Sequence, residues 1–296
     1  MSKGVSLEDV QKNKWDIAFV GRPIDDRGKA IVSQVHKHAN EVIELFYDAN
    51  NMTLTINTNS IQIKEFNAAV APYFGKKIIL ESTTLGVPEL IIGCDFFTNQ
   101  VKTRSFDLLY FEPREYRRQF DADDVMSFRN YSLSTGFLGF KGIPGYSFSL
   151  ESARNTPVVF FVGYEGERLA QAVESLPIEE KRRYVVFGVP AFQVGWEMDS
   201  FANNIETIGK EISKYDVQFC GADNPRAAYE LLEELFKGNK TNSFFVAPIG
   251  TKPHAIGTAL FCSKHPGNVG ILYDHPMRLE GRSKSLGPCH LYSIRK

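Results

Sequence analysis

Short apolar runs that end at a glycine or a proline, each followed by a segment with helical spacing, recur along this sequence. The first run is Trp15-Asp-Ile-Ala-Phe-Val20, which meets Gly21 and precedes a helix predicted over 28–44. A short apolar run bounded by turn residues is typical of a buried strand. The same pattern predicts further strands at 44–48, 52–57, 77–80, 106–111, 157–162, 184–187, 217–220, 244–246, 269–273 and 291–294. Strands that alternate with helices indicate an α/β fold with a mainly parallel sheet.

The second half of the sequence repeats the landmarks of the first. Phe19-Val-Gly21, with Arg27 a few residues on, matches Phe161-Val-Gly163 with Arg168. Three more pairs follow in the same order: 45–46 with 186–187, 78–80 with 244–246, and 108–110 with 271–273. We therefore expect an internal duplication into two similar Rossmann-like halves. The alternative is that any two α/β units look alike at this level, because strand–glycine–helix recurs in all of them.

Residues 116–155 differ from the segments on either side. They begin with charged runs and continue with several glycines between 134 and 146. Such a stretch is typical of a connector or a lid-like insertion, and a hairpin fits within it. We expect it to join an N-terminal half, 1–115, to a C-terminal half, 156–296.

Composition restricts the partners and the compartment that we expect. The chain has 34 basic and 35 acidic residues, a balance that argues against coating of bulk nucleic acid. The first residues lack the apolar core of a signal peptide, and no run reaches the roughly 20 apolar residues of a membrane span. The four cysteines show no Cys-x-x-Cys spacing, which favours reduced thiols. We expect a soluble, cytoplasmic protein with no membrane association.

The turns after the predicted strands carry the candidate ligand contacts. These turns gather at one edge of a parallel sheet, where helix N-termini offer N–H donors and partial positive charge. Gly250-Thr-Lys252 combines a glycine, a hydroxyl and a cation, which favours an anion, phosphate before carboxylate. The alternative is an ordinary strand-to-helix turn with a solvated lysine. The other candidates are Gly21, Arg27, Ser82, Thr83, Thr84, Gly163, Glu165 and Arg168.

These candidates also have structural interpretations. The two arginines can pair with nearby carboxylates instead of a phosphate, and the hydroxyls at 82–84 can cap a helix. If the duplication is real, we expect the two sets of turns to face one another across a cleft, with Glu112 and Asp274 nearby.

The motifs predict neither a cofactor nor a metal. The turns match neither Gly-x-Gly-x-x-Gly nor the spacing of a Walker loop, so we expect no dinucleotide and no other cofactor. No cluster of histidine, cysteine and carboxylate has metal-ligand spacing. Glu165, His254 and His275 are the candidates for acid–base chemistry because each lies near a strand end. For both histidines, a surface or capping position is the alternative.

The run Phe245-Val-Ala-Pro-Ile-Gly-Thr-Lys-Pro-His-Ala-Ile-Gly257 resembles the strand–Gly-Thr-Lys–helix segment of CRISPR-associated Rossmann fold (CARF) domains. Members of that family are Rossmann-like sensors that bind cyclic oligonucleotides, usually across a two-fold interface. The resemblance is confined to this run. It implies that Gly250, Thr251 and Lys252 contact a ligand, and it suggests a role in antiviral defence. The family usually has a second glycine where this chain has Ile249.

Three functions fit these patterns. The leading hypothesis is a Rossmann-like protein that binds a nucleotide or another phosphorylated small molecule between its halves, as a sensor or an accessory subunit. The alternative is an enzyme that hydrolyses a phosphoester or transfers a group from a nucleotide-activated donor. Its acid or base would be Glu165, His254 or His275, with Lys252 and Arg168 stabilising developing charge. The third is an interaction subunit whose aromatic insertion, 128–148, docks a protein partner or a second copy.

Overall fold

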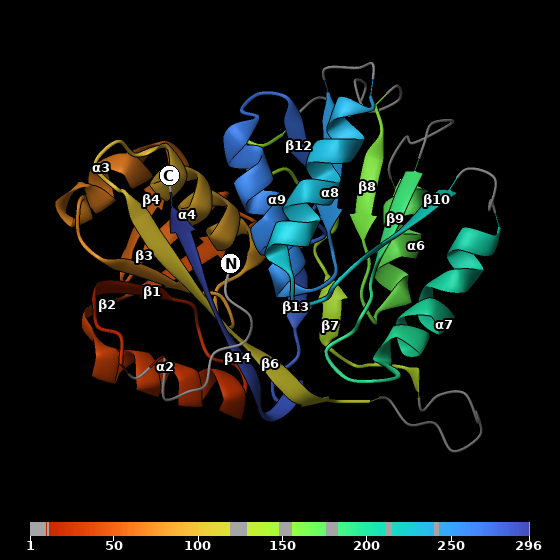
Figure 1. Cartoon of the computed structure of the whole chain (residues 1–296), viewed down its shortest axis with the longest axis horizontal. Coiled ribbons are helices and arrows are strands. Elements are labelled where there is room, and N and C mark those ends of the chain that lie inside the picture. Colours follow the sequence, from red (N-terminus) through yellow and green to blue (C-terminus); the bar gives the residue numbers. More distant parts are fainter. Residues whose placement is uncertain are drawn as a thin grey trace. The chain divides into compact units, whose positions relative to one another are not determined.

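The computed structural model describes residues 10, 12–118, 129–147, 156–175, 183–210, 215–239 and 243–295. The chain divides into two compact units (Figure 1). Unit 1 comprises Met1–Glu115 and Glu280–Lys296, and unit 2 comprises Tyr116–Leu279. Both units are mixed α/β structures whose larger sheets are mostly parallel.

Unit 1 is built on a seven-stranded sheet in the order β14-β6-β5-β1-β2-β3-β4. Its strands are β1 (Trp15–Val20), β2 (Ala39–Asp48), β3 (Thr53–Ile56), β4 (Asn59–Gln62), β5 (Ile78–Glu81), β6 (Ser105–Tyr116) and β14 (Ser283–Arg295). The four strands β6, β5, β1 and β2 pair in parallel, and β3 and β4 extend the sheet as an antiparallel hairpin. The helices are α2 (Asp26–His38), α3 (Phe66–Val70) and α4 (Val87–Asn99), with short 3-10 turns η1 (Ile63–Glu65) and η2 (Ala71–Tyr73).

The central strand β1 is apolar on both faces because helices cover both sides of a parallel sheet. Ala18 belongs to the same buried cluster as Ile31 and Val35 of α2. Phe19 packs on Phe97 of α4, with ring centroids 5.5 Å apart. This two-sided burial explains why the strand reads as a continuous apolar run.

Helix α2 ends at His38, six residues before its expected end at 44. The chain continues directly as β2, which pairs with β1 from Ala39 onward. Ile43, Leu45 and Tyr47 are buried in alternation, as a strand requires. Val42 and Ile43 fit helical spacing as well, so pairing with β1 decides the conformation.

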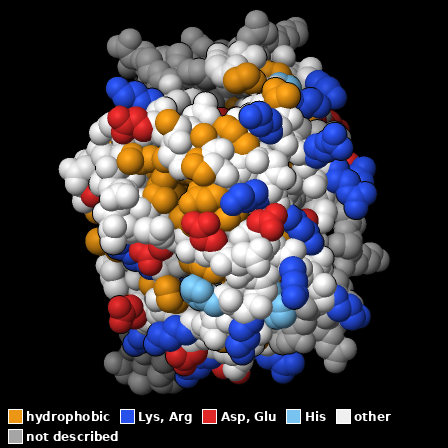
Figure 2. All heavy atoms as spheres, turned by 90° about the vertical axis from the view of Figure 1, so that its left-hand side faces the viewer, with side chains coloured by type: hydrophobic (Ala, Val, Ile, Leu, Met, Phe, Trp, Pro, Cys, Tyr) orange, Lys and Arg blue, Asp and Glu red, His pale blue; other side chains and the backbone are white. Residues whose placement is uncertain are grey.

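The surface of unit 1 carries hydrophobic side chains bordered by lysines and arginines (Figure 2). One exposed ring, Phe46, is partly covered within the unit. The Arg22 guanidinium carbon lies 4.3 Å from the centroid of that ring, and Arg22 Nε donates to Glu44 at 2.9 Å. A cation over an aromatic face shields apolar area while its charge stays in water.

Unit 2 is built on a five-stranded, wholly parallel sheet in the order β10-β9-β8-β11-β12. Its strands are β8 (Val158–Phe161), β9 (Arg183–Gly188), β10 (Tyr215–Cys220), β11 (Phe244–Pro248) and β12 (Val269–Ile271). The helices are α6 (Gly166–Ser175), α7 (Trp196–Gly209), α8 (Pro225–Lys237) and α9 (Lys252–Lys264). Strands β7 (Ser134–Phe137) and β13 (Pro276–Arg278) form a separate antiparallel pair.

The strand order of unit 2 reverses at β8. The chain moves outward through β9 and β10, then returns to the other side of β8 with β11 and β12. Helices α6 and α7 pack together, and so do α8 and α9, as right-handed crossovers on the two faces of one sheet require. The carboxyl ends of β8 and β11 therefore meet where the strand order reverses.

The unit boundaries differ from those expected at the C-terminus. Residues 280–296 belong to unit 1 rather than to the half expected at 156–296. Strand β14 lies next to β6 in the sheet, and Cys289 and Leu291 join the core of unit 1. The expected connector, 116–155, falls within unit 2 and contributes β7. Its residues 119–128 and 148–155 lie outside the described part of the chain.

Two further features concern the expected compartment. All four cysteines are described and buried, and no disulfide joins them. None of the helices in the described residues is long and apolar enough to cross a membrane.

Candidate functional site

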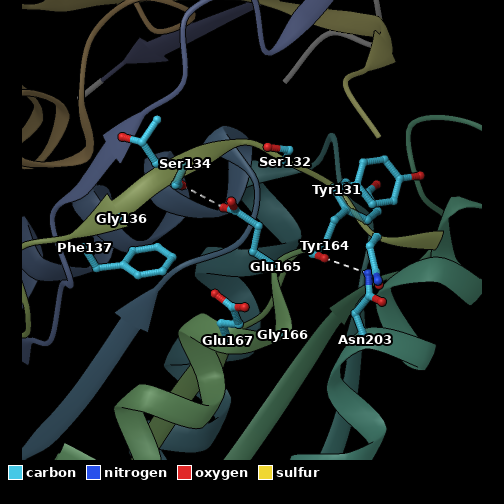
Figure 3. Close-up of a pocket in the computed structure, with 12 residues that line it drawn as sticks. Tyr131, Ser132, Ser134, Gly136, Phe137, Tyr164, Glu165, Gly166, Glu167 and Asn203 are labelled. Carbon is cyan, nitrogen blue, oxygen red and sulfur yellow. Dashed lines mark hydrogen bonds between the residues drawn. The ribbon is translucent and has the colours of Figure 1, made fainter. Parts of the chain in front are cut away.

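A cavity of about 300 Å³ lies in unit 2, beside the turn from β8 into α6 (Figure 3). Three segments line it: the stretch that leads into and forms β7, the turn after β8, and helix α7. The lining residues are 130–132, 134–137, 164–167 and 203. The cavity thus lies at the carboxyl end of β8, where parallel α/β sheets bind their ligands.

The turn at Gly163-Tyr-Glu-Gly166 shapes one wall of this cavity. A Cβ atom at Gly166 would lie 1.7 Å from the Asn203 carbonyl oxygen, so only glycine lets α6 begin this close to α7. The Asn203 side-chain amide donates to the Tyr164 carbonyl at 2.7 Å and to the Arg129 carbonyl at 3.0 Å. Asn203 therefore holds the turn and the stretch before β7 in place.

Glu165, a predicted ligand contact and candidate base, lies in the cavity wall. Its carboxylate accepts hydrogen bonds from Leu133 N at 3.2 Å and from Ser134 Oγ at 3.0 Å. Each oxygen thus already has a protein donor. Figure 3 shows Glu165 and Glu167 on the same side of the cavity, with the Phe137 ring reaching toward them from β7. Among the described residues that line the cavity, none is a lysine, an arginine or a histidine.

An aromatic cluster supports the cavity from one side. Tyr131 and Tyr164 line the cavity, and their ring centroids are 4.8 Å apart. Trp196 packs on Tyr164 at 5.6 Å. Tyr131 Oη donates to Asp199 at 2.6 Å, and Arg118 pairs with the same carboxylate at 3.2 Å. Burial raises the pKa of both tyrosines, so both phenols keep their protons near neutral pH.

Arg168 does not line the cavity, because its guanidinium is used inside unit 2. It makes two hydrogen bonds to Asp274, at 2.7 and 2.6 Å, and a third to the Ile249 carbonyl at 2.7 Å. Burial works to lower the pKa of Arg168, but the Asp274 carboxylate outweighs it and raises the pKa. Arg168 therefore pairs with a nearby carboxylate, which was the alternative to phosphate binding expected for this arginine.

The Gly250-Thr-Lys252 turn begins helix α9. Thr251 caps the helix by accepting from His254 N at 3.4 Å, and its hydroxyl donates to the Ala222 carbonyl at 2.8 Å. A Cβ atom at Gly250 would lie 2.7 Å from the Val162 carbonyl oxygen. Gly250 therefore allows the close approach of the β11 turn to β8, and Thr251 fixes the start of α9. The half-buried Lys252, at the first helical position, and the N-terminus of α9 are the features of this turn that suit an anion.

The two candidate histidines of unit 2 are buried away from the cavity. His254 is fully buried, and burial lowers its pKa to about 4. Its Nε2 lies 3.1 Å from the Gly221 carbonyl oxygen, and its ring packs on Phe161. His275 Nε2 lies 3.1 Å from the Lys141 carbonyl oxygen, and burial lowers the pKa of His275 as well. The surface position expected as their alternative is wrong for both.

The hydroxyls at 82–84 are buried in unit 1 and bonded to its own strands. Glu81 accepts from Thr83 N at 2.7 Å, from Thr84 N at 2.9 Å and from the Thr84 hydroxyl. Thr84 Oγ1 also accepts from Gly21 N at 2.9 Å, and Thr83 Oγ1 accepts from Phe111 N at 3.1 Å. None of these contacts is a helix cap. They tie the turn after β5 to its neighbours.

Ser82 and Arg27 are the remaining candidate ligand contacts in unit 1. Ser82 Oγ donates to the Leu80 carbonyl at 3.4 Å. Arg27 is buried, and its Nη1 donates to the Phe111 carbonyl at 3.0 Å. Both side chains thus bond to backbone oxygens of the strands in unit 1.

Several cavity residues were not candidates from the sequence. Ser132, Phe137 and Asn203 line the cavity but lie outside the predicted strand-end turns, whereas Glu167, which also lines it, lies between the candidates Glu165 and Arg168. The sequence indicated Ser132 and Phe137 only through the expected insertion, 116–155, whose described part supplies one wall of the cavity.

No protein-family model matches the sequence, and a search of curated proteins finds no match. Function must therefore be inferred from the geometry of unit 2.

Proposed function

We propose that this chain is a Rossmann-like binding protein that recognises a nucleotide or another phosphorylated small molecule through unit 2, as a sensor or an accessory subunit. One observation carries the proposal. The turns after β8 and β11 touch where the strand order reverses, since a Cβ atom at Gly163 would lie 3.4 Å from Gly250 Cα. Open α/β sheets bind ligands at such a reversal.

The phosphate would bind at the start of α9. This helix runs for 13 residues from Lys252, so its N-terminus carries a developed partial positive charge. Lys252 adds a full charge beside it. The cavity next to the β8 turn is unsuited to phosphate, because it presents Glu165 and Glu167.

The two units also support a shared origin, and we infer an internal duplication. The strand order β2-β1-β5-β6 in unit 1 corresponds to β9-β8-β11-β12 in unit 2. Arg27 bonds residue 111 and Arg168 bonds residue 274, and each bonded residue directly follows the tyrosine paired in the sequence, Tyr110 or Tyr273. In both units the glycine after the first strand contacts the turn after β5 or β11.

A thermal-shift and calorimetric panel tests the binding proposal. Mononucleotides, dinucleotides, cyclic oligonucleotides and nucleotide sugars would be compared on wild type, Lys252→Ala and Lys210→Ala. Lys210 is the matched control because it is an exposed lysine of unit 2, paired only with Glu206 among the described residues. Ligand at about 100 times its Kd should stabilise the protein by roughly 2.7 kcal/mol. This gain should fall in Lys252→Ala and persist in Lys210→Ala.

No stabilisation by any phosphorylated ligand would contradict the proposal. Equal losses in both lysine variants would show that Lys252 does not bind the phosphate. A cyclic oligonucleotide as the bound ligand would extend the proposal to the role in antiviral defence that the CARF resemblance suggests.

The alternative functions receive less support from the geometry. An enzyme would need its acid and base together, but His254 and His275 lie outside the cavity that contains Glu165. An interaction subunit would need exposed aromatic side chains in the insertion, yet Tyr131 is buried and Phe140 packs against the core of unit 2. Binding therefore ranks first.

A further inference from the structure

The hydrogen-bond donors of the cavity are mostly used by the protein itself. Ser134 donates to Glu165, and Thr135 donates to the Met277 carbonyl at 3.2 Å. The Asn203 side-chain amide donates hydrogen bonds to two carbonyls, and the Tyr131 hydroxyl donates a hydrogen bond to Asp199. These four side chains use their donors within the protein, so a molecule that binds beside them is favoured if it brings donors of its own. Asn130, Ser132 and Tyr164 also line the cavity.

The acceptors of the cavity carry negative charge. Glu167 is exposed, and among the described residues it has no hydrogen-bond or ion-pair partner. Glu165 has one donor on each oxygen and further lone pairs to offer. Arg168 interacts electrostatically with Glu165, but its guanidinium is paired with Asp274, and Arg118 is paired with Asp199. Charge complementarity favours a cation and disfavours any anion.

Three aromatic side chains lie among the small and polar residues that form the rest of the lining. The Phe137 ring reaches toward the two carboxylates (Figure 3), and Tyr131 and Tyr164 line the opposite part of the cavity. An aromatic face attracts a cation through its quadrupole, and this attraction is strongest where water is partly excluded. Two carboxylates and a neighbouring aromatic ring in one half-open cavity suit an ammonium group attached to a short carbon chain.

We propose that this cavity binds a small organic amine in its protonated, ammonium form. The ammonium donates to Glu167 and Glu165, and its carbon chain packs on Phe137. A volume of about 300 Å³ suits a molecule of a few carbon atoms. The inference goes beyond the proposed phosphate site and does not depend on it, because Lys252 and the start of α9 contribute nothing to this cavity.

Isothermal titration calorimetry at low salt tests the inference with four probes: putrescine, choline, ribose and inorganic phosphate. Putrescine can donate hydrogen bonds and carries charge, choline carries charge without N–H donors, and ribose offers neutral hydroxyls. We expect putrescine to bind best, choline more weakly, and the other two not at all in this cavity. Higher salt should weaken the binding of both cations, because attraction between partly exposed charges is screened.

Two matched variants locate the binding. Glu167→Gln keeps the shape and removes one charge, and Glu174→Gln makes the same change on an exposed residue of the same helix, away from the cavity. Putrescine affinity should fall about tenfold in Glu167→Gln, equivalent to about 1.4 kcal/mol, and remain unchanged in Glu174→Gln. Circular dichroism of both variants confirms that each is folded.

Three results would overturn the inference: no amine binding to wild type, amine binding unaffected by Glu167→Gln, or ribose binding equal to that of putrescine. The last result would indicate a polyol site. Lys252→Ala separates the two proposals, because it should weaken nucleotide binding and leave putrescine binding intact. Failure of one proposal is thus visible without failure of the other.

Discussion

Turns at strand ends in the two units use acidic side chains in different ways. In unit 1, Glu81 closes the turn after β5 onto itself, and Asp25 caps α2 by accepting from Gly28 N at 2.7 Å. In unit 2, Glu165 reaches away from its own turn to Leu133 and Ser134, and a cavity lies between the two segments. The same strand order thus supports a closed turn in one unit and an open one in the other. The two turns differ because Glu81 accepts from backbone N–H groups of its own turn, whereas Glu165 accepts from donors of another segment.

The largest effect is expected from the arginine pairs. Asp274→Ala leaves the buried Arg168 guanidinium without its carboxylate, so the free energy of unfolding should fall by about 3 to 5 kcal/mol. In unit 1 the Phe111 carbonyl accepts from Arg27 at the corresponding place. Urea denaturation measures the loss. The exposed Asp26→Ala is the control and should cost less than about 0.5 kcal/mol.

The double variant Arg168→Met/Asp274→Leu sharpens this prediction. Removing both charges together should recover most of the stability that Asp274→Ala loses, because no buried charge is left uncompensated. A double variant as unstable as Asp274→Ala would mean that packing, rather than charge, explains the loss.

A somewhat smaller effect is expected from the closed turn of unit 1. Glu81→Ala removes the acceptor for two backbone N–H groups and one hydroxyl, all buried. The unfolding free energy should fall by about 3 kcal/mol. In the turn after β11 of unit 2, Thr251→Ala removes only a helix cap and one hydroxyl bond and should cost about 1 kcal/mol. Equal costs for the two variants, measured by urea denaturation, would contradict the larger contribution assigned to Glu81.

The smallest effect at neutral pH is expected from His254 of unit 2. Burial lowers its pKa from the ordinary 6.5 to about 4. Between these values the unfolded chain binds a proton that the folded chain does not, so stability should decrease as pH falls from 6.5 to 4. The full loss is about 3 kcal/mol, and almost none of it is present at pH 7. Unfolding measured across this range should show a weaker pH dependence in His254→Gln than in wild type. Equal slopes would contradict the assigned pKa.

Local sequence patterns predicted much of the framework. The apolar runs at 217–220 and 244–246 lie in β10 and β11. These features depend on neighbours a few residues away, so the local pattern of apolar and turn residues reveals them. The end of α2 was missed because Val42 and Ile43 satisfy helix and strand spacing equally well.

The sequence by itself determined most of the strands and helices and which turns lie at strand ends, although not where α2 ends. Only the tertiary structure decided what the turn side chains do. Arg168 meets Asp274 across 106 residues, and Glu165 meets Ser134 across 31. Hydrogen bonds over such separations depend on how strands are ordered in a sheet and how an insertion folds back, and neither leaves a periodic signal in the chain. A charged residue at a strand end therefore looks the same in sequence whether it binds a ligand or a neighbouring strand.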